Sequence, residues 1–118
     1  MTRTFEQDAE VLRVARIMIE QPENWTKGVL ARHRNGNPIG YDTKNAYCFC
    51  MVGALCRASN DGLIPEEVLN AVKFAVCTIK QTAFLDEFND DPATTHADVL
   101  AAMDLARARL EICYAAHP

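Results

Sequence analysis

Two cysteines and two histidines are the residues whose types could support nucleophilic chemistry. Cys48 and Cys50 lie in an uncharged segment that we expect to form a helix from residue 46. The partial positive charge at a helix N-terminus lowers the pKa of a thiol in the first turn, and His33 or His96 would then act as its base. Cys48, the third helical residue, is better placed than Cys50 for this effect. The residues therefore leave open a cysteine-dependent, hydrolase-like enzyme.

Acidic and amide side chains supply the remaining candidate groups. Asn89 or Asp90 would orient the histidine ring in such a thiol mechanism. Two sets of residues could supply metal ligands. The softer set is Cys48, Cys50, His33 and His96, and the harder set is Asp90, Asp91, His96 and Asp98. Neither set has a recognised ligand spacing, so we expect no metal and no cofactor.

Each candidate also has an ordinary structural interpretation. Cys50 lies in a segment that is apolar on every side, which would raise the pKa of its thiol. Asn89 and Asp90 follow a helical segment, where short polar side chains commonly bond to free backbone groups. Trp25 is typical of an anchor that holds a loop against a core. We therefore expect no catalytic residue, and we name Trp25, Asn89, Asp90 and His96 as candidate binding residues.

Four helices are predicted to position these groups. Residues 5–20 form the first, and 46–59 form the second. Because the second carries no charge from 46 to 56, it should be buried on several sides at the centre of the fold. Gly53, unfavourable in a helix interior, would permit a close helix crossing there.

The other two helices lie in the C-terminal half. The third begins near Pro65, a residue suited to the first helical position, and either continues or restarts after Thr82. The fourth has a capping box in Thr95 and Asp98, like the one that Thr4 and Gln7 give the first helix.

Residues 23–45 interrupt the helical pattern with glycine and proline. Asn35-Gly36 is a strong hairpin signal, with alternating residues before it at 29–33 and after it at 39–41. We expect a loop or a short β-ribbon here, packed on the helices because an isolated ribbon is only marginally stable.

Composition bounds the class of protein. The chain has 118 residues, 49% of them hydrophobic and 24% charged, which predicts one compact domain over 1–118. With the four predicted helices, the expected fold class is all-α. A net charge of -4 disfavours nucleic acid as a partner, because nucleic-acid binders need a basic stripe. No apolar run approaches the roughly 20 residues of a membrane helix, so no membrane association is expected. Five cysteines, an odd number, without an export signal indicate reduced thiols in a cytoplasm.

Several short motifs together resemble a family of short bacterial and phage proteins with no assigned function. These are Trp25 with Gly28, the segment from Phe49 to Leu55 (Phe-Cys-Met-Val-Gly-Ala-Leu), Phe88-Asn89-Asp90, and Thr95 before Val99. The resemblance spans about residues 9–106 and implies a similar helical domain. It carries over no catalytic residues, and Cys48 and Asp91-Pro92 depart from its pattern.

These observations favour a small cytoplasmic, non-catalytic binding or regulatory module whose partner is another protein, related to phages or mobile elements. Two opposite charge clusters would steer such a partner: the acidic Asp86, Glu87, Asp90 and Asp91, and the basic Lys27, Arg32, His33 and Arg34. The apolar second helix leaves a homodimer open. The alternative remains a thiol hydrolase that uses Cys48 or Cys50 with His33 or His96.

Overall fold

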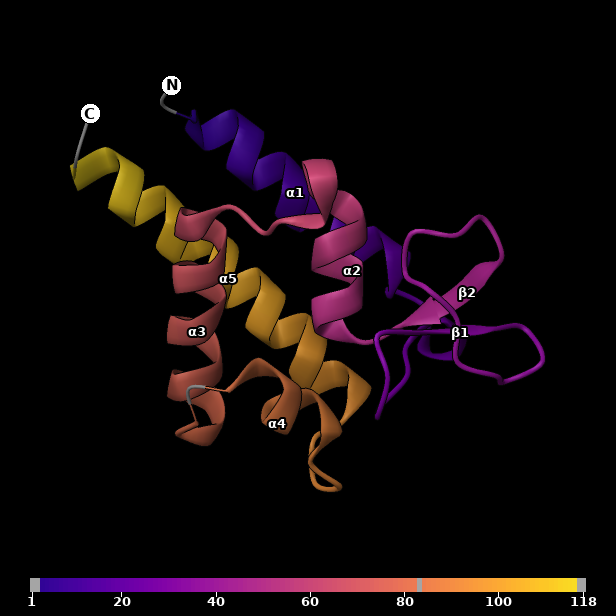
Figure 1. Ribbon diagram of the computed structural model, residues 1–118. Helices are drawn as coiled ribbons and strands as arrows, with labels where there is room; N and C mark the ends of the chain where they lie inside the picture. The colour runs from indigo at the N-terminus through magenta and orange to yellow at the C-terminus, as the bar shows by residue number, and fades with distance from the viewer. Residues whose placement is uncertain (1–2, 83, 117–118) are drawn as a thin grey trace.

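The computed structural model describes residues 3–82 and 84–116 of the chain (Figure 1). It is mostly helical, with a small two-stranded sheet at one side. The elements in chain order are α1 (Phe5–Met18), η1 (Pro22–Asn24), β1 (Ala31–His33), β2 (Ala46–Phe49), α2 (Met51–Ala58), η2 (Asn60–Gly62), α3 (Glu66–Lys80), α4 (Leu85–Asp90) and α5 (His96–Ala116). The chain is mostly helical as expected, and of the two alternatives predicted for 23–45 a short β-ribbon forms, although its second strand, β2, lies beyond that range.

The capping residues predicted for the first and last helices make the expected hydrogen bonds. At the start of α1, the Thr4 hydroxyl accepts from the Gln7 backbone N–H at 3.1 Å, and the Gln7 side chain accepts from the Thr4 N–H. Thr95 and Asp98 make the same reciprocal pair at the start of α5. Gln81 ends α3 in a left-handed conformation with φ 59°. The chain therefore restarts as α4, one of the two predicted alternatives.

The helix predicted over 46–59 is wrong in its first part. Ala46–Phe49 forms β2, which pairs antiparallel with β1, and α2 begins only at Met51. The backbone pairing continues beyond the strand, because the Cys50 N–H donates to the Leu30 carbonyl at 3.1 Å. An uncharged run has no polar face that would distinguish a period of 2 from a period of 3.6, so its length alone favoured a helix.

The predicted turn at Asn35-Gly36 forms, but the arm expected after it at 39–41 is not a strand. The Gly36 N–H donates to the His33 carbonyl at 2.8 Å, and the glycine adopts φ 92°. Pro38 makes only an isolated bridge to Arg32. The strand partner of β1 is β2, so the ribbon reaches beyond the expected range of 23–45. Pairing of β1 with β2 brings Leu30, the residue before β1, onto the start of α2.

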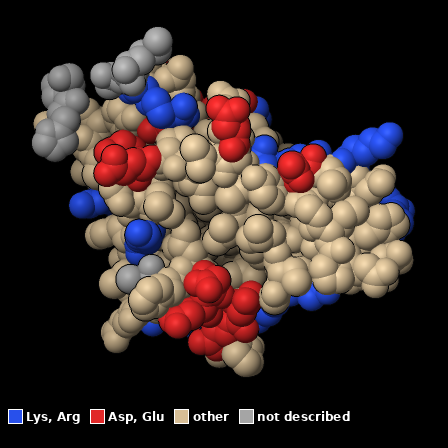
Figure 2. Space-filling model, viewed as in Figure 1, with Lys and Arg blue, Asp and Glu red and all other residues tan. Residues whose placement is uncertain are grey.

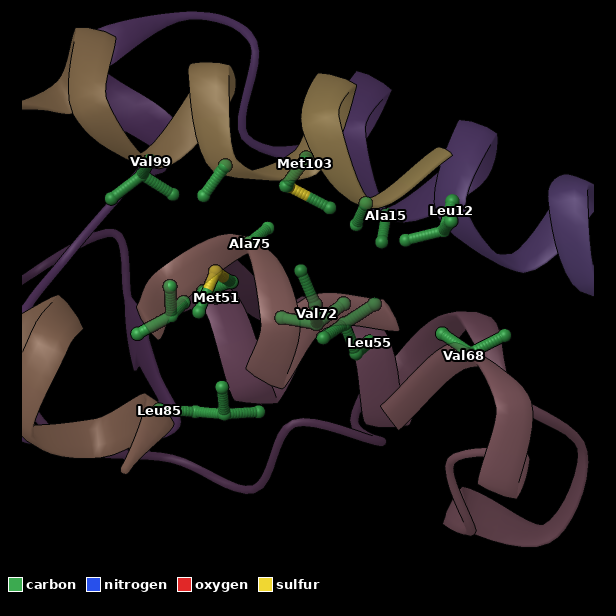
Figure 3. Packing of buried hydrophobic residues seen from close by; sticks show 14 of the residues in the cluster. Leu12, Ala15, Met51, Leu55, Val68, Val72, Ala75, Leu85, Val99 and Met103 are labelled. Atoms are coloured by element: carbon green, nitrogen blue, oxygen red, sulfur yellow. The ribbon is translucent and has the colours of Figure 1, made fainter. Parts of the chain in front are cut away.

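The core lies where α1, α2, α3 and α5 meet, and Figure 3 shows their apolar side chains pointing into this shared interior. The most extensive helix–helix packing is between α3 and α5, while α2 packs on α1 and α4. On α2, Met51 and Leu55 are fully buried, but Arg57 is exposed. None of residues 46–56 is exposed, and α2 contacts α1, α4 and the Leu30 backbone. The uncharged segment is therefore covered on several sides, as its composition predicted.

A buried carboxylate joins the two ends of the described chain. Asp8 of α1 is fully buried and accepts a hydrogen bond of 2.6 Å from the Tyr114 hydroxyl of α5, and Arg3 pairs with its other oxygen. Burial and the hydrogen bond to Asp8 raise the pKa of Tyr114 to about 12. Because this phenol loses its proton less readily when folded, its contribution to stability is complete below pH 10.0, its ordinary pKa, and is lost as pH rises through about 12.

We expect Tyr114→Phe to lower the free energy of unfolding by about 1–2 kcal/mol at neutral pH, because Asp8 loses a hydrogen-bond donor. Urea unfolding at a series of pH values measures this difference between wild type and variant. The difference should shrink as pH rises above 10.0, where the folded wild type holds a proton that the unfolded chain releases. A difference that is constant from pH 7 to 12 would show that the phenol proton contributes nothing.

Candidate functional site

Four residues named from the sequence as binding candidates lie together around one buried amide. Trp25 follows η1, His96 begins α5, and Asn89 and Asp90 end α4. The Trp25 indole N–H donates to the Asn89 side-chain oxygen at 2.7 Å. The ring of His96 lies 5.7 Å from the Trp25 ring, centre to centre. The fold thus joins segments that are 64 residues apart in sequence.

All hydrogen-bonding positions of the Asn89 amide are occupied. Its oxygen accepts a second bond, of 3.0 Å, from the Met51 backbone N–H at the start of α2. Its nitrogen donates at 3.0 Å to the Thr26 carbonyl and at 3.0 Å to the Asp90 carboxylate. Trp25, Thr26, Met51, Asn89 and Asp90 are here called the Asn89 junction. Because Asn89 is fully buried and fully bonded, it holds three segments together and offers no atom to a ligand.

Further hydrogen bonds connect the loop that carries Trp25 to the end of α4 and the residues after it. The same Asp90 oxygen accepts from the Gly28 N–H at 2.9 Å, and Gly28 adopts φ 86°, a conformation that favours glycine. The Lys27 ammonium donates to the carbonyls of Asp91 and Thr94 at 2.6 and 2.9 Å. Part of the predicted basic cluster therefore binds backbone groups of its own chain.

Neither candidate histidine is hydrogen-bonded to a candidate thiol. The Nε2 atom of His96 lies 2.6 Å from the Ile19 carbonyl, so this nitrogen carries a proton and donates it there. His33 is on β1, where its Nδ1 accepts from the Asn35 N–H at 3.1 Å. Within residues 3–82 and 84–116, no hydrogen bond joins a histidine to Cys48 or Cys50.

The two candidate cysteines occupy different positions from those predicted. Cys48 is not in a helix but in β2, opposite Arg32, and it is buried. Cys50 is the N-cap of α2, and its sulfur accepts from the Gly53 N–H at 3.2 Å. Burial raises the pKa of the Cys50 thiol more than the helix N–H groups lower it, and the Asp90 carboxylate raises it further. The thiol is therefore protonated and weakly nucleophilic at neutral pH.

A shallow pocket of about 240 Å³ opens beside the junction and is here called the α4 pocket. Its lining residues are Gly28, Val29, Leu30, Cys50, Val52, Asp86 and Asp90. The acidic residues of α4 border an uncharged, hollowed part of the surface in Figure 2. Across the described residues, no group of three or more potential ligands is close enough to hold a metal ion, so neither predicted ligand set is assembled.

Comparison with known proteins places this arrangement in a family. A family model described as a family of unknown function, DUF6197, matches residues 4–109. The chain belongs to the DUF6197 family. This confirms the expected membership in a family without an assigned function. No curated protein and no solved structure matches the chain. The matched range of the DUF6197 model contains the whole Asn89 junction and the α4 pocket.

The sequence of this DUF6197 chain did not reveal two of the four residues that Asn89 bonds, Thr26 and Met51. Thr26 and Met51 contribute backbone atoms, which carry no signature of residue type. Leu30 was also missed, although 42% of this residue is exposed at the pocket. Gly28 gave a usable signal, because a glycine after a tryptophan anchor is suited to a tight loop with positive φ. Among the described helices of this family member, none is long and apolar enough to cross a membrane.

Proposed function

We propose that the protein is a non-catalytic binding module whose partner is another protein. The observation that carries this proposal is the contrast between the Asn89 junction and the α4 pocket. The polar side chains that would form an active site bond to each other and to backbone, whereas the neighbouring pocket is open and lined by Val29, Leu30 and Val52. The proposal includes a cytoplasmic location, in which the thiols remain reduced.

The thiol hydrolase is the competing function, and alkylation separates the two. We expect iodoacetamide at pH 7 to modify the exposed Cys77 first and Cys50 more slowly than free cysteine, because the raised pKa of Cys50 leaves little thiolate. Site-resolved mass spectrometry over time measures both rates, and denaturant should release Cys50. Modification of Cys50 faster than free cysteine, abolished by Cys50→Ser, would contradict the non-catalytic proposal.

Binding itself can be tested by photo-crosslinking in the native host. A benzophenone amino acid replaces Leu30, which is 42% exposed at the pocket, or Ile112 of α5, which is 60% exposed elsewhere and serves as the matched control. The proposal predicts a discrete protein adduct from position 30 that position 112 does not give. Absence of an adduct at position 30, or the same adducts from both positions, would overturn it.

A further inference from the structure

We propose that the α4 pocket binds a basic segment of its partner protein, with a lysine or arginine side chain next to an apolar one. This inference rests on the proposed function and specifies the chemistry of the partner. Two features of the pocket carry it: an apolar wall of suitable size and an adjoining set of carboxylates that form no ion pair within the described residues.

The apolar wall is formed by Val29 and Leu30 from the loop and by Val52 from α2. The pocket volume of about 240 Å³ lies below the roughly 300–1,000 Å³ of most small-molecule sites. A space of this size fits a side chain that belongs to a larger partner. Leu30 at its edge is 42% exposed, and contact with a partner would remove this apolar surface from water.

The acidic side of the pocket is formed by Asp86 and Asp90, and Glu87 and Asp91 are their sequence neighbours. Within the part of the chain that the structure describes, six ion pairs form, and none of them includes these four carboxylates. The nearby Lys27 ammonium donates to the backbone carbonyls of Asp91 and Thr94 and forms no ion pair with these carboxylates, so one positive charge stands near four negative ones. The wall of the pocket that α4 provides therefore keeps its negative charge (Figure 2).

This charge pattern is unfavourable for α4 alone. Asp86 and Asp90 are four residues apart on one helix, a spacing at which like charges repel. Asp90 also lies at the C-terminal end, where the helix dipole disfavours negative charge. A cation from a partner would relieve both effects, so the charge pattern selects a basic occupant over an acidic or neutral one.

A larger groove between α1 and α5, of about 410 Å³, is the main competitor. Its charged lining side chains balance, three acidic and three basic, and most of them are paired: Arg13 with Glu10, Arg16 with Asp104 and Arg107 with Glu111, while Glu6 enters none of the ion pairs among the described residues. That groove therefore presents no net charge that would choose a partner. The α4 pocket differs because its two charged lining residues, Asp86 and Asp90, are both acidic and enter no ion pair among the described residues.

The test uses the full chain and two short fluorescent peptides, one alternating lysine and leucine and the other alternating glutamate and leucine. Fluorescence anisotropy should show binding of the lysine peptide only, and the affinity should fall as salt is raised. Asp86→Lys should weaken this binding by about tenfold or more, because a rim charge is reversed. Glu6→Lys, the same charge change in the α1–α5 groove, should leave the affinity unchanged. Backbone NMR shifts on titration should centre on Gly28, Val52 and Asp86.

Three outcomes would overturn the inference. The first is equal binding of both peptides, and the second is an equal loss of affinity in the two charge-reversal variants. The third is self-association detected by light scattering that Asp86→Lys abolishes, because the pocket would then be covered by a second copy of the chain. If the adduct from position 30 forms but is unaffected by Asp86→Lys, the binding function stands and the basic partner does not. Asp86 makes no side-chain bond among the described residues, so a melting temperature near the wild-type value should verify that this variant folds.

Discussion

Replacing Gly53 by alanine is expected to destabilise the protein by about 3 kcal/mol, although alanine is normally the better helix former by about 1 kcal/mol. A Cβ atom at position 53 would lie 2.0 Å from the Leu30 carbonyl oxygen and 2.8 Å from its carbonyl carbon. Both contacts are with backbone, which cannot rotate away as a side chain does. The start of α2 would have to move from the loop, which breaks the hydrogen bond from the Cys50 N–H to Leu30.

Gly40→Ala is the matched control for this substitution. Its Cβ would meet the side chains of Asp42 and Thr43 at 2.9 and 3.4 Å, and these can turn aside. Urea unfolding of both variants should show a large loss of stability for Gly53→Ala and a change within about 0.5 kcal/mol for Gly40→Ala. If Gly53→Ala is as stable as the wild type, α2 does not approach the Leu30 backbone as the structure describes.

Replacing Asn89 by alanine is expected to have the largest effect on stability, a loss of about 4 kcal/mol. The substitution removes the acceptor of the Trp25 indole and of the Met51 N–H, and the donor to the Thr26 carbonyl. Each buried group left without a partner is unfavourable by about 1–3 kcal/mol. Chemical denaturation measures the loss, and intrinsic fluorescence of Trp25 should report that its indole becomes more exposed in the folded variant.

Trp25→Phe provides the graded comparison, because it removes one donor and leaves the other three bonds of Asn89. We expect a loss of about 1–2 kcal/mol, and non-additive effects in the double variant because the two residues share a hydrogen bond. An Asn89→Ala protein with wild-type stability would contradict a structural role for this amide. It would return Asn89 to the list of ligand-binding candidates.

The local signals in the sequence predicted those elements whose ends are marked by side chains. Thr4 and Thr95 cap α1 and α5 because their hydroxyls reach backbone N–H groups within the same segment. The strand at Ala46–Phe49 could not be found in this way. Its pairing with Ala31–His33 depends on backbone groups across an intervening loop, and its uncharged residues fit a helix equally well.

For the candidate site, too, the sequence indicates which residues matter but not which atoms they contact. Trp25, Asn89, Asp90 and His96 were identified by residue type, and the fold brings them together. Their roles depend on which atoms already have partners, and that depends on three-dimensional contacts. Gly53 illustrates the point: its type predicted a close approach, but the neighbour is the Leu30 backbone and not a crossing helix.

Hydrogen exchange of the Trp25 indole N–H most directly tests whether the Asn89 junction is structural. The chain contains one tryptophan, so a single indole signal reports on this bond by NMR. If the junction is closed and opens only when the protein unfolds, the free energy of exchange should equal that of global unfolding. Exchange as fast as in a free indole would mean that the junction is open to water in the folded protein. The residues around Asn89 would then be available to a ligand or substrate, contrary to this account.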